Sequence, residues 1–592
     1  FFKNLYIPVI LGKHVTMDSG TGSVHTAPDH GQDDYIVSKK YNIKPLNLVD
    51  FKGHYINNIH SKLNSINIFT ANSIIIQLLQ DKKILLHHEL IKHSYPHCWR
   101  HKKPIIFRAT PQWFINIDKK ELRNNALKTI KKVTWHPQWG ESRITEMLNK
   151  RPDWCISRQR KWGIPICIFT HKKTDDLHPN TLFLMEEIAK IIENKGIEHW
   201  WKINVKELLK NDYKNYNQVL DTLDIWFESG STYSSIKYKN KKYFTNKADM
   251  YLEGSDQHRG WFMSSLIIST LITKKAPYKE VITHGFVVDK NGQKMSKSIG
   301  NTKSPNDIIN VLGADILRLW VASSNYSAEI SISDEILKRL SDTYRRIRNT
   351  ARFMLANIHD FQPSIHIINK NDMVYLDKWA IGQTKKVQDQ IIDLYSKYNF
   401  HLIIQRIMYF CSIEMGSFYL DIIKDRQYTL KKDSRERRSC QTAIYYILHA
   451  MVRWIAPILS FTADEIWNYL PEKKSKYVFT EEWFEKLFYL NNNSLFNYVF
   501  WDQLIKIKHE VNKLLEDNKK NNNIHNSLET SIILYVNPEL ENQLKILDKE
   551  LKFIFLTSDA QVKKYEKAPE KAQKSTSIKG LKIYIKKSNE KK

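Results

Sequence analysis

The sequence predicts a multidomain α/β protein whose parallel sheet is followed by a helical bundle and a small α+β region. Between Tyr95 and about Ala328, apolar strands alternate with amphipathic helices, as in MYLEG, then SDQHRGWFMSSLIISTLI, then EVITHGFVVD. That βαβ order is typical of a parallel sheet. After Ser333, apolar residues recur every three or four positions, which indicates long packed helices. A chain of 592 residues is long enough to form several such domains.

These changes in pattern divide the chain into four regions, residues 1–95, 96–332, 333–480 and 481–592. The first mixes strand-like runs with Gly and His clusters, so we expect part of a β-rich domain. The second carries the βαβ pattern, and its polar segment at about 171–217 predicts an inserted subdomain. The third is the helical bundle. The fourth has a weaker signal and ends with the Lys-rich strand GLKIYIKK, which predicts a small α+β region.

Two features define the helices of the bundle. An apolar stripe from Ile336 to Ile358 predicts one long helix. Thr462-Ala-Asp-Glu465 has the pattern of a capping box, in which the two end residues satisfy the first backbone N–H groups of a helix. We therefore expect another helix to begin near Thr462.

Composition limits the class of protein. Five cysteines without a CxxC pair exclude a disulfide framework and a four-cysteine zinc site within this chain. No apolar run approaches the roughly 20 residues that cross a bilayer, so we expect a soluble, cytoplasmic monomer without a membrane partner. A net charge of +28 suits a polyanionic partner such as RNA, although AT-rich coding also produces a Lys-rich chain. The chain begins at Phe1 without an initiator Met, and we expect a fragment of a longer protein.

A polar loop in HGFVVDKNGQKMSKSIGN, residues 284–301, carries Lys294 and Lys297 around Ser296. A strand ends at VVD, an Asn-Gly turn follows, and Ser-Pro at 304–305 starts the next helix. We expect the loop to be held only at its two ends. Both lysines could then close on a triphosphate and neutralise charge as pyrophosphate leaves. Taken alone, the K-x-S-K tetrapeptide would be assigned to a solvated basic loop.

The stretch MYLEGSDQHRGWF places Glu253 and Gly254 at the carboxyl end of a strand, where open α/β sheets bind ligands. We expect Ser255 to cap the following helix. If helical geometry extends back to the strand, Glu253, Gln257 and Trp261 share one face. A carboxylate, an amide and an aromatic wall suit the ammonium group and apolar side chain of an amino acid. Trp261 by itself would be assigned to core packing.

Together these stretches resemble the class I aminoacyl-tRNA synthetases, which attach an amino acid to tRNA through an aminoacyl-adenylate. KMSKSIGN is similar to the second signature of that family, and DQHRGWF to its isoleucyl branch. The fold implied is the second half of a Rossmann-type catalytic domain. The roles implied are catalytic for Lys294, Ser296 and Lys297; ATP-binding for Lys297, His284, Gly285 and Asp256; and amino-acid- or adenylate-binding for Glu253, Gly254, Gln257, Trp261 and Trp226.

One further segment matches the same family. DWCISRQRKWGIPI, residues 153–166, is similar to the isoleucyl, valyl and leucyl enzymes, and we expect Arg158 and Gln159 to hold the catalytic domain together more than to act in catalysis. Glu228 stands where the family usually has Asp, which is a mild departure from the pattern.

The segment GTGSVHTAPDHGQDDY, residues 20–35, resembles the editing site of these enzymes. Rejecting valine by one missing methylene gives limited discrimination, so a second, hydrolytic site is required. The resemblance implies that Asp34 binds the ammonium of the misattached amino acid while His25 and Thr26 shape the pocket. Singly, His25 would be a structural histidine and Asp34 a turn residue. Valyl enzymes usually have Lys and leucyl enzymes Met in place of His25, so the isoleucyl branch is favoured and a valyl-type enzyme is the alternative.

The bundle resembles the anticodon-binding domain of these synthetases. Cations can fix the phosphate backbone and aromatic rings can stack on unpaired bases. Solvated helix faces are the ordinary alternative for such side chains. The predicted tRNA-binding residues are Arg345, Arg346, Arg348, Arg352, Lys424, Arg426 and Tyr428.

The resemblance implies that the complete protein uses ATP with Mg²⁺ to attach L-isoleucine to tRNA(Ile), and hydrolyses misattached valine. The first family signature, HxGH, does not occur in this sequence, and zinc is expected only in a four-cysteine module beyond its C-terminal end. We therefore expect the chain alone to form no adenylate. The rival hypothesis is a noncatalytic tRNA-binding fragment of a synthetase.

Overall fold

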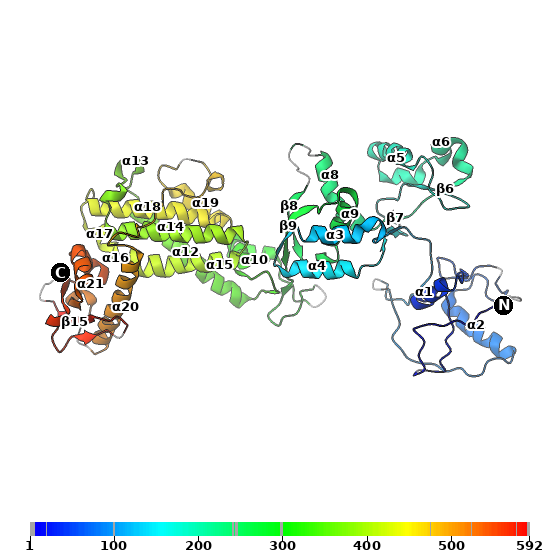
Figure 1. Cartoon of the computed structure of the whole chain (residues 1–592), viewed down its shortest axis with the longest axis horizontal. Helices are drawn as coiled ribbons and strands as arrows, with labels where there is room; N and C mark the ends of the chain where they lie inside the picture. The colour runs from blue at the N-terminus through cyan, green and yellow to red at the C-terminus, as the bar shows by residue number, and fades with distance from the viewer. Residues whose placement is uncertain are drawn as a thin grey trace. The chain divides into compact units, whose positions relative to one another are not determined.

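The structure is a computed structural model that describes residues 6–18, 20–57, 59–98, 101–160, 162–239, 242, 247–296, 300–473, 475–521, 524–575 and 577–588. The chain divides into two compact units (Figure 1). The first consists of Phe1–Glu121 and Arg151–Glu228, and the second of Leu122–Lys150 and Ser229–Lys592. None of the described helices is both long enough and apolar enough to span a bilayer.

The N-terminal part of the first unit contains two helices, α1 (Gln32–Lys40) and α2 (Ile68–Asp81). Across the described residues up to 95, extended segments meet only at isolated bridges, such as the one between Val49 and Tyr55. The prediction of a β-rich part is therefore wrong for these residues. The apolar run after Asn67 forms α2 instead of a strand, because the Asn67 side chain accepts the backbone N–H of Phe69 and caps a helix there.

The remainder of the first unit consists of short antiparallel pairs and one inserted segment. The pairs are β1 (Phe114–Ile115) with β3 (Trp154–Cys155), β4 (Ser157–Arg158) with β7 (Thr222–Leu223), and β5 (Phe169–His171) with β6 (Tyr216–Gln218). Between β5 and β6 lie α5 (Thr181–Lys195) and α6 (Val205–Leu209). This segment buries a small core of its own around Trp200, which is fully buried.

The second unit begins with a parallel three-stranded sheet in the order β2 (Thr134–His136), β9 (Tyr278–His284), β8 (Ala248–Gly254). Helix α9 (Trp261–Thr273) connects β8 to β9, so the predicted βαβ unit is confirmed. The buried residues of α9 include Phe262, Met263 and Leu266. Helices α3 (Leu122–Ile130) and α4 (Trp139–Asn149) lie beside α9 and the sheet (Figure 1).

The predicted strand EVITHGFVVD is broken after β9. The Gly285 N–H donates to Tyr326 O, and a Cβ on Gly285 would lie 2.0 Å from Ala328 O. This close approach bends the chain, and β10 (Val287–Val288) then pairs in parallel with β11 (Ile330–Ser331).

Two helices follow β10, α10 (Pro305–Leu312) and α11 (Ala314–Ser323). Helix α10 begins as predicted, because the Ser304 side chain accepts the backbone N–H of Asn306 and Pro305 occupies its first turn.

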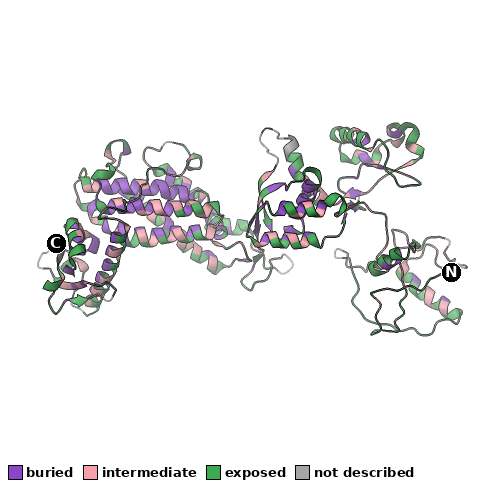
Figure 2. Cartoon of the chain, in the orientation of Figure 1, coloured by how far each residue is buried: buried purple, intermediate pink, exposed green. Residues whose placement is uncertain are grey.

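The bundle contains α12 (Asp334–Asn357), α13 (Pro363–His366), α14 (Tyr375–Ser396), α15 (Phe400–Tyr409), the π-helix Phe410–Tyr419, α16 (Leu420–Ile422), α17 (Lys424–Thr429), α18 (Arg435–Ile455) and α19 (Ser460–Tyr469). The predicted long helix is α12, whose inner face buries Ile347, Ala351 and Met354 completely or nearly so. Helices α14 and α18 form the centre of the bundle and carry most of its buried residues (Figure 2).

Helix α19 starts at Ser460, two residues before the predicted capping box. Its first N–H groups are satisfied by Asp315 of α11, whose carboxylate accepts the backbone N–H of Thr462 at 2.8 Å and its hydroxyl at 2.6 Å. The capping-box prediction is therefore wrong. A carboxylate from a distant helix replaces the local cap, and no local pattern reports such a partner.

The predicted α+β region is present at the C-terminal end of the chain. Its sheet has the order β13-β12-β15-β14, with bounds Asp559–Lys564, Thr530–Val536, Leu581–Lys587 and Gln573–Lys574. Strand β12 is central and every one of its residues is buried. The helices of this region are α20 (Tyr498–Lys520), α21 (Pro538–Leu547) and α22 (Glu550–Phe555).

Candidate functional site

The carboxyl edge of β8 and β9 brings several predicted site residues together. In the parallel register Gly254 lies beside His284, and Glu253 beside Thr283. A Cβ on Gly254 would lie 2.8 Å from Asp256 Oδ1 and 3.6 Å from His284 Cε1. Because only a glycine leaves this space, the Asp256 and His284 side chains can approach the end of β8. Glu253 is exposed at the same edge.

The connection from β8 to α9 differs from the prediction. Ser255–His258 forms a 3-10 turn, and α9 starts only at Trp261, after Gly260. Ser255 therefore does not cap α9, and the predicted trio does not share one continuous helix. Gln257 provides the local link, because its Oε1 accepts the backbone N–H of Trp261 at 3.0 Å while its Nε2 donates to Asp256 Oδ2 at 3.2 Å.

Trp261 is held as a rigid wall within the second unit. Its ring stacks on Tyr251 with centroids 3.9 Å apart and planes 10° from parallel, and its Nε1 donates to Ser229 O at 2.9 Å. Burial raises the pKa of the Tyr251 hydroxyl, so that ring stays neutral. No sequence motif had indicated a role for Tyr251. Trp226, the other predicted wall, lies in α7 (Ile225–Gly230) and is 41% exposed.

The polar loop after β10 is braced near its middle, which corrects the expectation that it is held only at its ends. Asp289 accepts the backbone N–H of Asn291 at 2.9 Å and the side-chain Nδ2 of Asn301 at 3.0 Å. The hydrogen bond from Asn301 is the main reason that the pKa of Asp289 is lowered. Asn301 Oδ1 in turn accepts the backbone N–H of Ser296 at 2.9 Å.

Within this loop Lys294 is exposed, and its ammonium lies 3.8 Å from the centroid of the Phe286 ring. Met295 follows Lys294 and packs against the apolar cluster around Trp320. Lys297, the second predicted catalytic lysine, lies outside the described residues.

The predicted editing residues lie in the first unit. Asp34 Oδ2 accepts the backbone N–H of Ala27 at 2.9 Å, so the carboxylate is held against the segment that contains Thr26. A Cβ on Gly31 would lie 2.8 Å from Asp34 Oδ2, which explains the glycine at the start of α1. His25 is exposed on the same segment.

His14, which no motif indicated, also lies near Asp34, with its Nε2 4.0 Å from Asp34 Oδ1.

A buried carboxylate organises the strands at the end of the first unit. Asp224, 3% exposed, accepts the Trp154 Nε1 at 2.9 Å and lies 3.1 Å from Arg158 Nη2. These contacts fit the prediction that Arg158 holds the domain together. Glu228, which departs from the family pattern, accepts the backbone N–H of Ile164 at 3.0 Å.

Two arginines of α12, Arg348 and Arg352, line a hollow of about 510 Å³ beside α19. Arg345, Arg346 and Arg352 are exposed, and Arg348 pairs with Glu465 at 3.0 Å. The hollow is lined by Arg348, Arg352, Leu355, Ala356, His359, Glu465, Ile466 and Tyr469. Cations and an apolar, partly aromatic surface are thus adjacent, which suits both the phosphates and the bases of RNA.

Arg426 is a correction. This residue is 1% exposed, with its Nη1 3.6 Å from Asp377 Oδ1, and it also forms an ion pair with Glu550 of α22. A guanidinium buried between two carboxylates is not available to RNA, so Arg426 is withdrawn from the predicted tRNA contacts. Lys424 and Tyr428, on the same short helix, are exposed.

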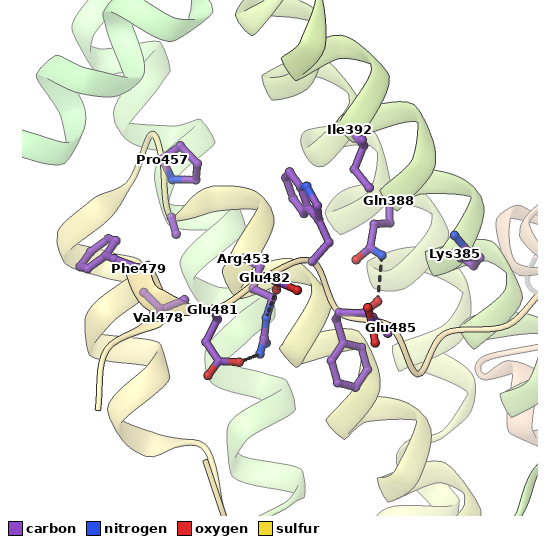
Figure 3. Close-up of a pocket in the computed structure, with 13 residues that line it drawn as sticks. Lys385, Gln388, Ile392, Arg453, Pro457, Val478, Phe479, Glu481, Glu482 and Glu485 are labelled. Carbon is purple, nitrogen blue, oxygen red and sulfur yellow. Dashed lines mark hydrogen bonds and ion pairs between the residues drawn. The ribbon is translucent and has the colours of Figure 1, made fainter. Parts of the chain in front are cut away.

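Another cavity, of about 720 Å³, lies in the bundle between α14, α18 and the segment after α19 (Figure 3). Its one deeply placed cation, Arg453, forms an ion pair with Glu481 and donates Nε to Glu482 O at 2.8 Å. No predicted site residue lines this cavity. Throughout the described ranges, no three His, Cys, Asp or Glu side chains form a group that could hold a metal ion.

The family model of tRNA synthetases class I (I, L, M and V) matches residues 33–333, just over half of the 592-residue chain. The anticodon-binding domain of tRNA ligase matches residues 377–534. With the parallel sheet, the strand-edge residues and the bundle, these matches show that the chain belongs to the class I tRNA synthetases.

Its similar curated relatives are isoleucine–tRNA ligases of Buchnera aphidicola. The relative from subsp. Schizaphis graminum (strain Sg) is 68% identical over 592 residues, and that from subsp. Acyrthosiphon pisum (strain Tuc7) is 67% identical. Each comparison covers 100% of this chain and 63% of the relative, so the chain spans less than two thirds of their length. The solved ternary complex of Agrobacterium radiobacter K84 LeuRS, tRNA and LeuAMS matches 79% of this chain and 50% of its own at 18% identity, with a TM-score of 0.44.

Proposed function

We propose that the complete protein is a cytoplasmic, monomeric enzyme that uses ATP to attach L-isoleucine to tRNA(Ile) through an isoleucyl-adenylate. The observation that carries this proposal is the carboxyl edge of β8 and β9, where Glu253, Gly254, Asp256 and His284 lie together. The chain continues from this edge through β10 into the Lys294 loop. The identity of 68% with an isoleucine–tRNA ligase along the whole chain supports the choice of amino acid.

The proposed reaction takes MgATP and isoleucine as substrates. Glu253 and Gln257 hold the ammonium of isoleucine, and the apolar side chain lies against Trp261. The isoleucine carboxylate attacks the α-phosphorus of ATP, and the bond to the departing pyrophosphate breaks. Lys294, with Lys297, neutralises the charge that builds up on the phosphates, which is electrostatic stabilisation of the transition state. A ribose hydroxyl of the tRNA then displaces AMP and forms the ester.

Editing of valine belongs to the same proposal. One missing methylene gives only about 150-fold discrimination, a figure established for isoleucyl-tRNA synthetase itself, so synthesis alone cannot be accurate enough. We infer that Asp34 binds the ammonium of misattached valine while His25 and Thr26 border the pocket. The hydrogen bond from Ala27 N–H to Asp34 supports this, since it holds the carboxylate beside those two residues.

For the tRNA, we propose that the exposed cations of α12 and α17 contact phosphates. The hollow lined by Arg348, Arg352 and Tyr469 supports this assignment, because its cations adjoin an exposed aromatic ring. The proposed contacts are Arg345, Arg346, Arg348, Arg352, Lys424 and Tyr428.

The test is isoleucine-dependent exchange of pyrophosphate into ATP by the complete protein. Lys294→Ala and Lys297→Ala should each slow exchange by about 100-fold or more, the scale of one lost transition-state contact. Lys290→Ala, on the same loop, is the matched control and should leave the rate unchanged. A wild-type rate in Lys294→Ala would remove its assigned role.

The same assay distinguishes the alternatives. Exchange that is faster with valine than with isoleucine would indicate a valyl-type enzyme. Binding of tRNA without any amino-acid-dependent exchange would indicate a noncatalytic RNA-binding protein. The isolated chain is expected to bind tRNA weakly and to support no exchange, and detectable exchange by it would contradict that expectation.

A further inference from the structure

Phe286 occupies a fixed position directly after His284 and Gly285, two of the predicted ATP-binding residues. Its carbonyl accepts the backbone N–H of Ile330 at 2.9 Å, and the preceding Gly285 is pressed against the backbone at Ala328. Phe286 is half-buried and lies in the chain between the end of β9 and the start of β10. Because its backbone is tied on both sides, Phe286 presents a rigid aromatic face to the loop that follows.

Lys294 rests on that face. Its ammonium lies 3.8 Å from the ring centroid, well inside the roughly 6 Å range of cation–π attraction. Among the described residues, no carboxylate lies within ion-pair distance of Lys294. An isolated β-bridge between Val288 and Lys294 and the Asp289–Asn301 hydrogen bond fold the loop back on itself. The backbone of Lys294 is thereby held above the Phe286 ring.

We propose that Phe286 is a positioning residue that holds the Lys294 ammonium on its ring in the unliganded protein. The proposal rests on the proposed function only where ATP is concerned. A cation–π contact at an exposed site is weak, so a triphosphate, with its formal negative charges, can take the ammonium from the ring. The Phe286 ring keeps the Lys294 ammonium ordered near the site, and the ammonium leaves the ring when a phosphate binds it.

The test measures how fast Lys294 is acetylated in the complete protein without ATP. Acetylation needs an amine that is free to meet the reagent, and contact with the ring holds the amine back, so contact with Phe286 slows the reaction. Lys290 lies on the same loop and serves as the internal reference, and the ratio of the Lys294 to the Lys290 rate is read by peptide mass spectrometry. Phe286→Leu keeps an apolar side chain but removes the ring, whereas Phe286→Tyr keeps the ring.

The Lys294 to Lys290 ratio should rise about two- to fivefold in Phe286→Leu, the range that an exposed cation–π contact allows, and stay at the wild-type value in Phe286→Tyr. A ratio in Phe286→Leu equal to that of the wild type would overturn the proposal, even if both lysines react faster through loosening of the loop. A ratio that rises equally in both variants would overturn it too, because the ring would not be the cause.

Adding MgATP separates this proposal from the proposed function. If Lys294 contacts the phosphates, MgATP should slow its acetylation in the wild type and in both variants. If MgATP has no effect while the dependence on Phe286 persists without it, the phosphate role of Lys294 fails and the resting contact stands.

Discussion

Replacing Arg426 by Met should destabilise the bundle without removing an RNA contact. Arg426 is 1% exposed and Asp377 is fully buried, so the substitution leaves a carboxylate inside the protein without its guanidinium. Two neutral donors remain on that carboxylate, the Tyr419 hydroxyl at 2.8 Å and the Ser439 hydroxyl at 2.6 Å. Burial already raises the pKa of Asp377, and Arg426 opposes that rise.

The expected loss in the free energy of unfolding is about 3 kcal/mol. Breaking a buried pair by removing one partner costs about 3–5 kcal/mol. The low end applies because Asp377 keeps two hydrogen bonds and because Glu550, the other partner, is 25% exposed and can be hydrated. Lys424→Met is the matched control, since Lys424 lies on the same helix and is 50% exposed, so its stability change should stay within about 0.5 kcal/mol.

Urea unfolding of the chain gives the overall change, and hydrogen exchange of peptides from α14 and α18 assigns it to the bundle, because a chain of two units need not unfold in one step. In the double variant Arg426→Met, Asp377→Asn no buried charge is left, and part of the loss should return. A change below about 1 kcal/mol in Arg426→Met, together with a fall in tRNA affinity as large as that of Lys424→Met, would refute the reasoning, since those values are expected of an exposed contact.

Three other predictions concern stability. Burial lowers the pKa of His258 to about 4, so between pH 6.5 and 4 the unfolded chain takes up a proton that the native protein does not. The free energy of unfolding is therefore highest above pH 6.5 and falls by up to about 3 kcal/mol as the pH drops from 6.5 to 4. In His258→Leu the urea midpoint should depend less on pH over that range. Asp315→Ala should lower the free energy of unfolding by about 2–3 kcal/mol, because two N–H groups and the hydroxyl at the start of α19 lose their acceptor. Asp315→Asn should lower it less. Equal urea midpoints for the two variants would contradict this prediction. Burial lowers the pKa of Lys508 to about 8, so its charged form opposes folding below pH 8. This penalty disappears as the pH rises toward 10, and the thermal midpoint of the wild type should rise with it. The thermal midpoint of Lys508→Met should not show that rise.

Local patterns predicted those elements whose partners are close in sequence. The βαβ unit around α9, the cap at Ser304 and the long helix α12 follow from apolar periodicity and a neighbouring capping residue. The start of α19 could not be predicted, because Asp315, which satisfies its N–H groups, lies far away in the chain. Burial of Arg426 was hidden for the same reason, since both of its carboxylate partners come from other helices.

The candidate site divides in the same way. A motif indicates which residue types meet at the strand edge, and the register of β8 and β9 places Gly254 beside His284 as expected for parallel strands. The contacts that position those residues come from residues outside the short motifs. Tyr251 beneath Trp261 is an apolar strand residue like many others, and its role depends on the 3-10 turn that delays the start of α9.

The anchoring of α19 on Asp315 has a mechanical consequence. Arg318, one turn further along α11, donates Nε to Ile458 O and Nη2 to Pro457 O, each at 2.8 Å. The segment at the start of α19 is thus fastened to α11 at both edges, and α11 follows the Lys294 loop through α10 alone. These hydrogen bonds couple the start of α19 mechanically to α11. A force that tilts α19 is therefore passed to α11, which follows the Lys294 loop and α10 in the chain.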